Sequence, residues 1–295
     1  MKEKWKKWFA GSLIKTNKEF SEFQKLLPEF NFLNYSEPEI RKKNIELIKH
    51  KSSLIREVIL NKGGWLLPEK AYRKDPTHLT MADMHDREFD DFVLNHNFTT
   101  SLFTRFKFIV NDLLPRYINK FTQNGKKVKI ASFGSGSGFD VMEAIKKFNG
   151  FCSADLYEID PVAIEAGKRC AKENNLIEKI KFIRNDFTKI KNYKFDIGLL
   201  IGIICPLSDS LAKKTMHDIY KGMPVGSVLI VSSSSDRMPD DTLGRFIIEY
   251  CGDWYLQFRD SIRMEKLAKQ SDFKVLEILE EPMKYHKLMV CVKQD

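Results

Sequence analysis

The sequence predicts an α/β protein, with a doubly wound, mostly parallel seven-stranded sheet that ends in an antiparallel hairpin and follows an α-helical N-terminal segment. Two observations carry this prediction. From residue 126 onward, short β-rich apolar runs alternate with helical patterns, which implies βαβ units. Before residue 120, apolar residues recur at i, i+3 and i+4 without any alternating strand pattern. We therefore expect a helical cap or lid segment over residues 1–120 and an α/β domain over 121–295.

Helical spacing in the N-terminal part predicts helices over 18–33, 39–61 and 99–119. Ser36 and Glu39 resemble the two ends of a capping box, so Ser36 is the expected N-cap of the second helix. Asn61-Lys-Gly-Gly64 predicts the end of that helix, because glycines past a helix accept the left-handed conformation.

Apolar residues near the start of the chain also repeat at helical spacing, and they are Trp5, Trp8, Phe9, Leu13 and Ile14. A first helix packed on the body explains this pattern, and a helix on a membrane surface or on a nucleic acid is the alternative.

Seven apolar runs predict the strands, at 128–133, 153–159, 180–184, 195–201, 227–232, 274–280 and 287–292. The helices expected between them cover 138–148, 161–174, 209–222 and 259–271. Only residues 281–286 separate the last two strands, too few for a helical crossover, so these strands should pair antiparallel.

Composition narrows the class of protein. The 295 residues carry 49 basic and 40 acidic side chains, and 43% are hydrophobic, which excludes a disordered or collagenous chain. Five cysteines without any CxxC argue against a disulfide framework or a structural zinc site, and they favour a cytoplasmic location. No window approaches the ~20 apolar residues of a membrane span. The basic charge is scattered among acids, so a nucleic-acid partner is not expected.

A glycine-rich loop, Gly134-Ser135-Gly136-Ser-Gly138, directly follows the first predicted strand and opens a helix. Glycines there let the backbone turn tightly and bring N–H groups against an anionic or polar ligand. Taken alone, the loop is a weak signal, and an ordinary glycine-rich strand–helix turn is the alternative.

Two acidic residues at the ends of the next strands sharpen the interpretation. Glu158 lies 20 residues past Gly138, where a carboxylate can accept hydrogen bonds from two ribose hydroxyls. Asp160 is the second candidate, although the Asp-Pro pair fits a helix N-cap better. Asp186 could accept from an adenine amino group and Phe187 could stack on the ring, while a turn or cap is the alternative role of Asp186. Together these residues predict an adenosine-containing ligand at the switch point of an open sheet.

Residues 126–292 resemble the class I S-adenosylmethionine-dependent methyltransferases. The glycine-rich loop resembles the family's first motif, residues 156–161 its second, 183–187 its third and 195–207 its fourth, and the Pro-Gly stretch at 223–232 follows in order. The resemblance implies a Rossmann-like methyltransferase fold and S-adenosylmethionine as co-substrate. It implies cofactor contacts from Gly134, Ser135, Gly136, Gly138, Glu158, Ile159, Asp186, Phe187 and Ile201.

The resemblance implies in-line methyl transfer to a small-molecule acceptor. At two positions the sequence departs from the family's motifs, which leaves other functions open. Ser132 stands where the family usually has an acid, so Asp140 could contact the methionine amino group instead. Cys205 stands in the fourth motif where many members have polar or aromatic residues. The alternatives are an enzyme that transfers or cyclises the aminocarboxypropyl arm, and a non-catalytic binding or scaffold protein. A nicotinamide-dependent dehydrogenase is disfavoured because Phe139 stands where its motif needs a small residue.

Residues 65–97 form a polar, histidine-bearing stretch without helical periodicity, and we expect an irregular loop there. One hypothesis gives this stretch a chemical role. It forms a lid over the carboxyl ends of the strands, and Tyr72 or His85 touches the acceptor or takes its proton. A solvated loop is the plain alternative. The spacing of its His and Asp residues matches no common metal site, so no metal is expected.

Overall fold

The computed structural model describes residues 18–32, 34–35, 37–80, 86–123, 125–148 and 151–294. Several residues named above lie outside this part of the chain: Trp5, Trp8, Phe9, Leu13, Ile14, Ser36 and His85.

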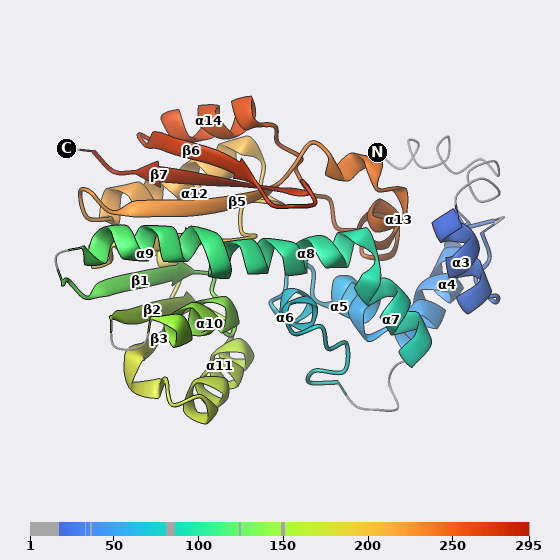
Figure 1. The fold of residues 1–295 in the computed structure, drawn as a ribbon. Helices are drawn as coiled ribbons and strands as arrows, with labels where there is room; N and C mark the ends of the chain where they lie inside the picture. The colour runs from blue at the N-terminus through green and yellow to red at the C-terminus, as the bar shows by residue number, and fades with distance from the viewer. Residues whose placement is uncertain are drawn as a thin grey trace.

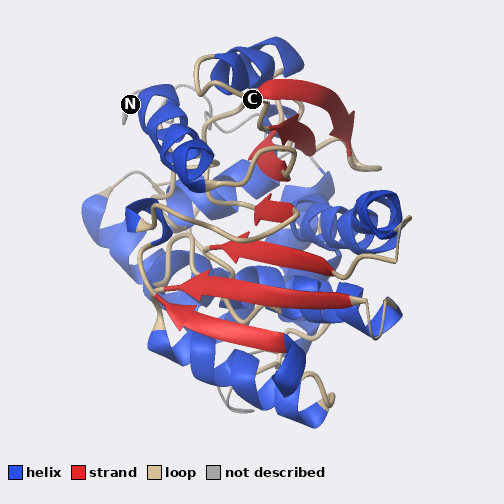
Figure 2. Cartoon of the chain, turned by 90° about the vertical axis from the view of Figure 1, so that its left-hand side faces the viewer, coloured by secondary structure: helices blue, strands red, loops and turns tan. Residues whose placement is uncertain are grey.

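Seven strands form one sheet in the order β3-β2-β1-β4-β5-β7-β6, as predicted (Figures 1 and 2). Their bounds are β1 Val128–Phe133, β2 Cys152–Glu158, β3 Ile180–Arg184, β4 Ile197–Leu200, β5 Val228–Ser234, β6 Lys274–Glu280 and β7 His286–Val292. Neighbouring strands are parallel from β3 to β5, and β7 runs antiparallel to both β5 and β6. The order of the strands reverses between β1 and β4, which places a ligand crevice at their carboxyl ends.

Helices cover both faces of the sheet, and the central strands β1, β4 and β5 are buried along almost their whole length. One apolar layer joins the sheet to α9 (Leu114–Thr122), α10 (Phe139–Lys147) and α11 (Pro161–Glu173). The other joins it to α12 (Asp209–Gly222) and α14 (Ser261–Lys269). Short 3-10 turns at Ile177–Lys179, Phe187–Lys189 and Met238–Asp240 complete the links.

The helices predicted over 18–33 and 39–61 are shorter than predicted, because local residues interrupt them, whereas the helix predicted over 99–119 runs without a break from Asn97 to Thr122. The first described helix, α3 (Lys18–Leu26), ends before Pro28, which cannot continue a helix. Ser52 divides the expected helix 39–61 into α4 (Pro38–Lys51) and α5 (Ser53–Leu60), and its hydroxyl oxygen accepts from the Ile55 N–H at 3.0 Å. Before α9, a π-turn at Ile109–Leu113 follows α8 (Asn97–Phe108) and precedes Pro115, which has no N–H to donate.

The expectation of an irregular loop over 65–97 was wrong. Helices α6 (Leu66–Arg73) and α7 (Arg87–Asn95) form there, and Asp86 caps α7 by accepting from the Phe89 N–H at 3.2 Å. Both helices are short, so tertiary packing rather than propensity stabilises them.

A segment after β5 was also missed: α13 (Thr242–Arg245) and a π-turn at Phe246–Cys251. Phe246 packs edge-on against Phe20, Phe23 and Phe30, so this segment shares one apolar cluster with the N-terminal helices. The predicted boundary between a helical cap segment (1–120) and an α/β domain (121–295) therefore stays a prediction. Among the described residues, none of the helices has both the length and the apolar character needed to cross a bilayer.

Candidate active site

A cavity of about 1090 Å³ opens at the carboxyl ends of β1, β2, β4 and β5. Residues from both parts of the chain line it: the glycine-rich loop and strand ends on one side, and α6, α8 and the segment after β5 on the other. This volume lies just above the range of about 300–1,000 Å³ for small-molecule sites.

The glycine-rich loop has the conformation that its glycines permit. Gly134, Gly136 and Gly138 all have positive φ, at 64°, 56° and 76°. A Cβ on Gly136 would lie 2.6 Å from Cβ of Trp65, which no side chain tolerates. Gly138 caps α10 and is not part of the cavity wall, whereas Gly134, Ser135 and Gly136 are. The loop therefore fits tightly beneath the residue that precedes α6.

Glu158 stabilises this loop through a hydrogen bond to its backbone. Its carboxylate accepts from the backbone N–H groups of Gly136 at 2.8 Å, Ile159 at 2.7 Å and Asp160 at 3.0 Å, and it lines the cavity. Asp160 caps α11 through the Val162 N–H at 2.8 Å and accepts from the Trp65 indole at 2.9 Å. The interpretation of Asp160 as an N-cap is confirmed.

The remaining predicted cofactor residues also line the cavity. Asp186 caps a short turn by accepting from the Thr188 N–H and hydroxyl at 3.0 and 2.7 Å, and that hydroxyl hydrogen bond lowers the pKa of Asp186. Phe187 and Ile201 line the cavity too, and Ile159, which is 65% exposed, lies at its wall. An apolar side chain this exposed is available to pack on a ligand.

Helix α6 closes the cavity from the N-terminal side through Glu69, which is 4% exposed. The Ser137 hydroxyl donates to its carboxylate, Arg73 pairs with it at 2.7 Å, and His78 lies 3.1 Å away. Burial alone would raise the pKa of Glu69, but the hydrogen bonds from His78 and Ser137 and the charge of Arg73 hold this pKa below its usual range.

Two charged residues line the cavity, Arg105, which sequence reasoning missed, and Asp140, which it named. Arg105, on α8, is 3% exposed, and its Nη2 donates to the Tyr72 hydroxyl at 2.8 Å. Among the described residues, its Nε has no hydrogen-bond partner and no carboxylate lies within ion-pair distance of the guanidinium. Asp140 lines the same cavity, and burial raises its pKa.

Tyr72 itself stacks on Phe106, with ring centroids 4.7 Å apart. Burial raises the pKa of its phenol, so the hydroxyl stays protonated near neutral pH. His85, the other predicted catalytic residue, lies outside the described residues.

His286 at the start of β7 is the second residue that the sequence did not reveal. It pairs in register with Ser234 at the end of β5, and both line the cavity. Burial and the charge of Arg105 lower the pKa of His286 to about 4, so the imidazole is neutral near pH 7. Glu281, fully buried, lies 3.9 Å from its Nδ1 and accepts from the Thr104 hydroxyl at 2.6 Å.

The half of the cavity away from the glycine-rich loop has an apolar wall from α8 and the segment after β5. It consists of Phe98, Leu102, Met238, Trp254 and Leu256. Such a wall suits a flat or apolar ligand group.

No family model matches this chain. No curated protein matches it either. Solved structures do match. A possible exported protein from Bordetella parapertussis covers 97% of this chain and 100% of its own length, with a TM-score of 0.65 and 12% identity. Magnesium protoporphyrin IX methyltransferase from Synechocystis, bound to SAH, covers 66% of this chain and 85% of its own, with a TM-score of 0.52 and 11% identity.

The pyocyanin biosynthetic protein PhzM matches with a TM-score of 0.49 and 13% identity, over 60% of this chain and 54% of PhzM, so this chain spans about half of that protein. The order of the strands and the match to the Synechocystis enzyme agree with the resemblance that the motifs carry. The chain has the fold of the class I S-adenosylmethionine-dependent methyltransferases.

Proposed function

We propose that this protein is an S-adenosylmethionine-dependent methyltransferase that acts on a small-molecule acceptor. One observation carries the proposal: a single cavity joins a polar half, made by the glycine-rich loop, Glu158 and Asp186, to an apolar half. The polar half suits an adenosine, and the volume leaves room for an acceptor beside it.

In this proposal Glu158 accepts from the ribose hydroxyls, Asp186 from the adenine amino group, and Phe187 packs on the ring. Arg105 and Asp140 suit the two charges of the methionine end, the guanidinium for the carboxylate and the acid for the ammonium. Asp140 would then replace the acid that Ser132 lacks.

Tyr72 positions Arg105 by accepting its hydrogen bond, and the raised pKa of the phenol makes it a poor base. His286 is the better-placed candidate for the base, because it lines the cavity and its imidazole is unprotonated near pH 7, although a pKa of about 4 makes it a weak base. A base is needed only where the acceptor is protonated, since the sulfonium is already an activated methyl donor. Orientation within a closed cavity supplies much of the remaining rate.

Product analysis tests the proposal against its alternatives. The protein is incubated with S-adenosylmethionine and fractions of a metabolite extract, and the nucleoside products are separated. S-adenosylhomocysteine supports methyl transfer. Methylthioadenosine indicates transfer or cyclisation of the aminocarboxypropyl arm, and neither product indicates a binding or scaffold role.

A small-molecule acceptor is favoured over a nucleic acid because α6 and the segment after β5 enclose the cavity. Strong, salt-dependent binding of tRNA would contradict this choice. A cytoplasmic location also belongs to the proposal, supported by the five cysteines, all described and none in a disulfide.

A further inference from the structure

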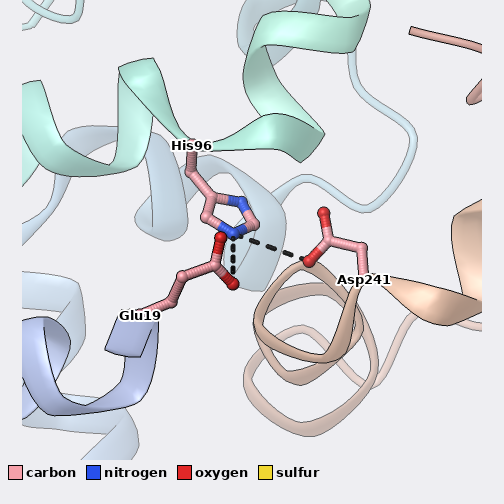
Figure 3. A group of neighbouring side chains, drawn as sticks. All are labelled: Glu19, His96 and Asp241. Atoms are coloured by element: carbon pink, nitrogen blue, oxygen red, sulfur yellow. Dashed lines mark ion pairs between the residues drawn. The ribbon is translucent and has the colours of Figure 1, made fainter. Parts of the chain in front are cut away.

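A second cluster of polar side chains lies where three helices meet (Figure 3). Glu19 comes from the first turn of α3, His96 from the junction of α7 and α8, and Asp241 from the N-terminus of α13. The imidazole of His96 points between the two carboxylates (Figure 3). Its Nε2 lies 3.5 Å from Oε2 of Glu19 and 3.5 Å from Oδ1 of Asp241.

Two atoms of this cluster are buried without a hydrogen-bond partner among the described residues. They are Nε2 of His96 and Oδ2 of Asp241, and both side chains are only 2% exposed. A buried polar atom left unsatisfied is costly, so a native protein seldom keeps one without a ligand or another reason.

The two His96–carboxylate ion pairs are longer than charge-assisted hydrogen bonds. A charge-assisted hydrogen bond from an imidazolium to a carboxylate is about 2.7–2.9 Å long, well below the two separations of 3.5 Å. Ligands of a tetrahedral zinc ion, at about 2.0–2.2 Å from the metal, lie about 3.4 Å from one another. The nitrogen–oxygen separations therefore fit neighbouring corners of a coordination tetrahedron.

We propose that Glu19, His96 and Asp241 bind a divalent transition-metal ion, with zinc as the best fit, through one imidazole nitrogen and two carboxylate oxygens. A nitrogen ligand favours zinc over magnesium or calcium, which prefer oxygen alone. Solvent fills the fourth position.

Neighbouring groups fix one of the proposed ligands, and a second cavity gives a cation access to the cluster. Asp241 Oδ1 accepts from the Gly244 N–H at 2.7 Å, which fixes the carboxylate. A second cavity of about 440 Å³ borders Glu19 and His96, and Glu22, Glu88 and Asp91 also line it. These acids make its mouth attractive to cations.

Metal binding has one local cost. The Nδ1 of His96 accepts from the Phe98 N–H at 3.3 Å, which holds the ring proton on Nε2. A metal on Nε2 moves this proton to Nδ1 and breaks that long hydrogen bond. The ring stays neutral, so no proton leaves it, and the metal satisfies Nε2 in return.

The metal would act on stability rather than on the reaction. It joins α3 to α8 and to α13, and the segment that contains α13 also supplies part of the apolar wall of the candidate active site. Sequence spacing could not reveal the site, because Glu19 and Asp241 lie 77 and 145 residues from His96.

The experiment uses the untagged full chain, stripped with a chelator and then titrated with zinc. We expect one equivalent of zinc to remain after gel filtration, measured by mass spectrometry of the metal, and a rise in Tm. His96→Gln, Asp241→Asn and Glu19→Gln should each weaken zinc binding at least tenfold, whereas Glu22→Gln and His50→Gln should leave it unchanged.

Cobalt gives a readout that needs no variant. One equivalent of Co²⁺ added to the stripped wild-type chain should produce the intense visible absorption of a four-coordinate site, and zinc should abolish it. Absence of these bands together with an unchanged Tm on adding zinc would overturn the proposal. Equal zinc affinity in wild type and a folded His96→Gln variant would overturn it as well.

Discussion

The hydroxyl of Ser137 in the glycine-rich loop donates a hydrogen bond to the carboxylate of Glu69 on α6. This contact joins residues that are 68 positions apart and is buried. Arg73 and His78 lie against the same carboxylate, so the charge of Glu69 is well compensated. The geometry of the loop is thus coupled to a helix of the N-terminal part.

We expect Glu69→Gln to destabilise the protein at pH 7, because a neutral amide loses the charge interactions with Arg73 and His78. The pKa of Glu69 is lowered on folding, so the stability it contributes is present above its unfolded pKa of about 4.3 and is lost as the pH falls through the lower folded value. The difference in Tm between wild type and variant should therefore be largest near pH 7 and shrink below pH 4. A difference that stays constant from pH 7 to pH 3 would contradict the role of the charge.

Glu158→Ala should weaken binding of S-adenosylhomocysteine more than tenfold in calorimetry. The alanine removes two expected ribose hydrogen bonds, at about 1.5–3 kcal/mol each, and also releases the Gly136 N–H that the carboxylate holds. Glu165→Ala on α11 is the matched control, because Glu165 is exposed and, among the described residues, forms an ion pair with Lys168 alone. Unchanged affinity in Glu158→Ala would reject the ribose role.

The sheet could be predicted from sequence because its strands are short β-rich runs, mostly apolar, that alternate with helical patterns. The observed bounds of β1, β3 and β6 agree with the predicted ones, and β4 is shorter by a few residues. Helices α6 and α7 could not be predicted because their polar residues make distant contacts. Asp90, expected in a loop, is fully buried and accepts from the Ser52 hydroxyl at 2.6 Å and the Ser53 N–H at 3.0 Å.

The candidate site likewise has one part that sequence could predict and one part that it could not. The glycine-rich loop, Glu158 and Asp186 follow consecutive strands, so parallel topology alone brings them to one edge. Arg105 comes from a helix that precedes the sheet, and His286 is the first residue of β7 in the terminal hairpin. Only the packing of these elements brings both residues to the cavity.

Gly136→Ala should destabilise the loop and abolish binding of S-adenosylhomocysteine. The alanine would have a positive φ and its Cβ would collide with Trp65. Gly226→Ala separates these effects, because Gly226 also has a positive φ, 78°, but nothing lies within 4 Å of its added Cβ. We expect the Gly226 variant to lose about 1–2 kcal/mol of stability and no affinity for the ligand. Equal affinities in the two variants would show that Trp65 does not constrain the loop.

The last prediction concerns His286, whose pKa falls from 6.5 to about 4 on folding. Between these values the unfolded chain binds a proton that the folded protein does not, so the free energy of unfolding should decrease as the pH falls from 6.5 to 4. The loss expected from this group is on the order of 3 kcal/mol. His286→Gln should remove this part of the pH dependence in urea titrations, whereas His50→Gln, on an exposed position of α4, should leave it intact.

The same variant tests the catalytic role. If His286 is the base, His286→Gln should reduce kcat far more than it weakens binding of S-adenosylhomocysteine, and the wild-type rate should not fall between pH 8 and pH 6 on account of this imidazole. A wild-type rate in His286→Gln with any acceptor that carries a proton at the methylated atom would rule out the base. A loss of ligand affinity equal to the loss of rate would assign His286 to the wall of the cavity instead of to proton transfer.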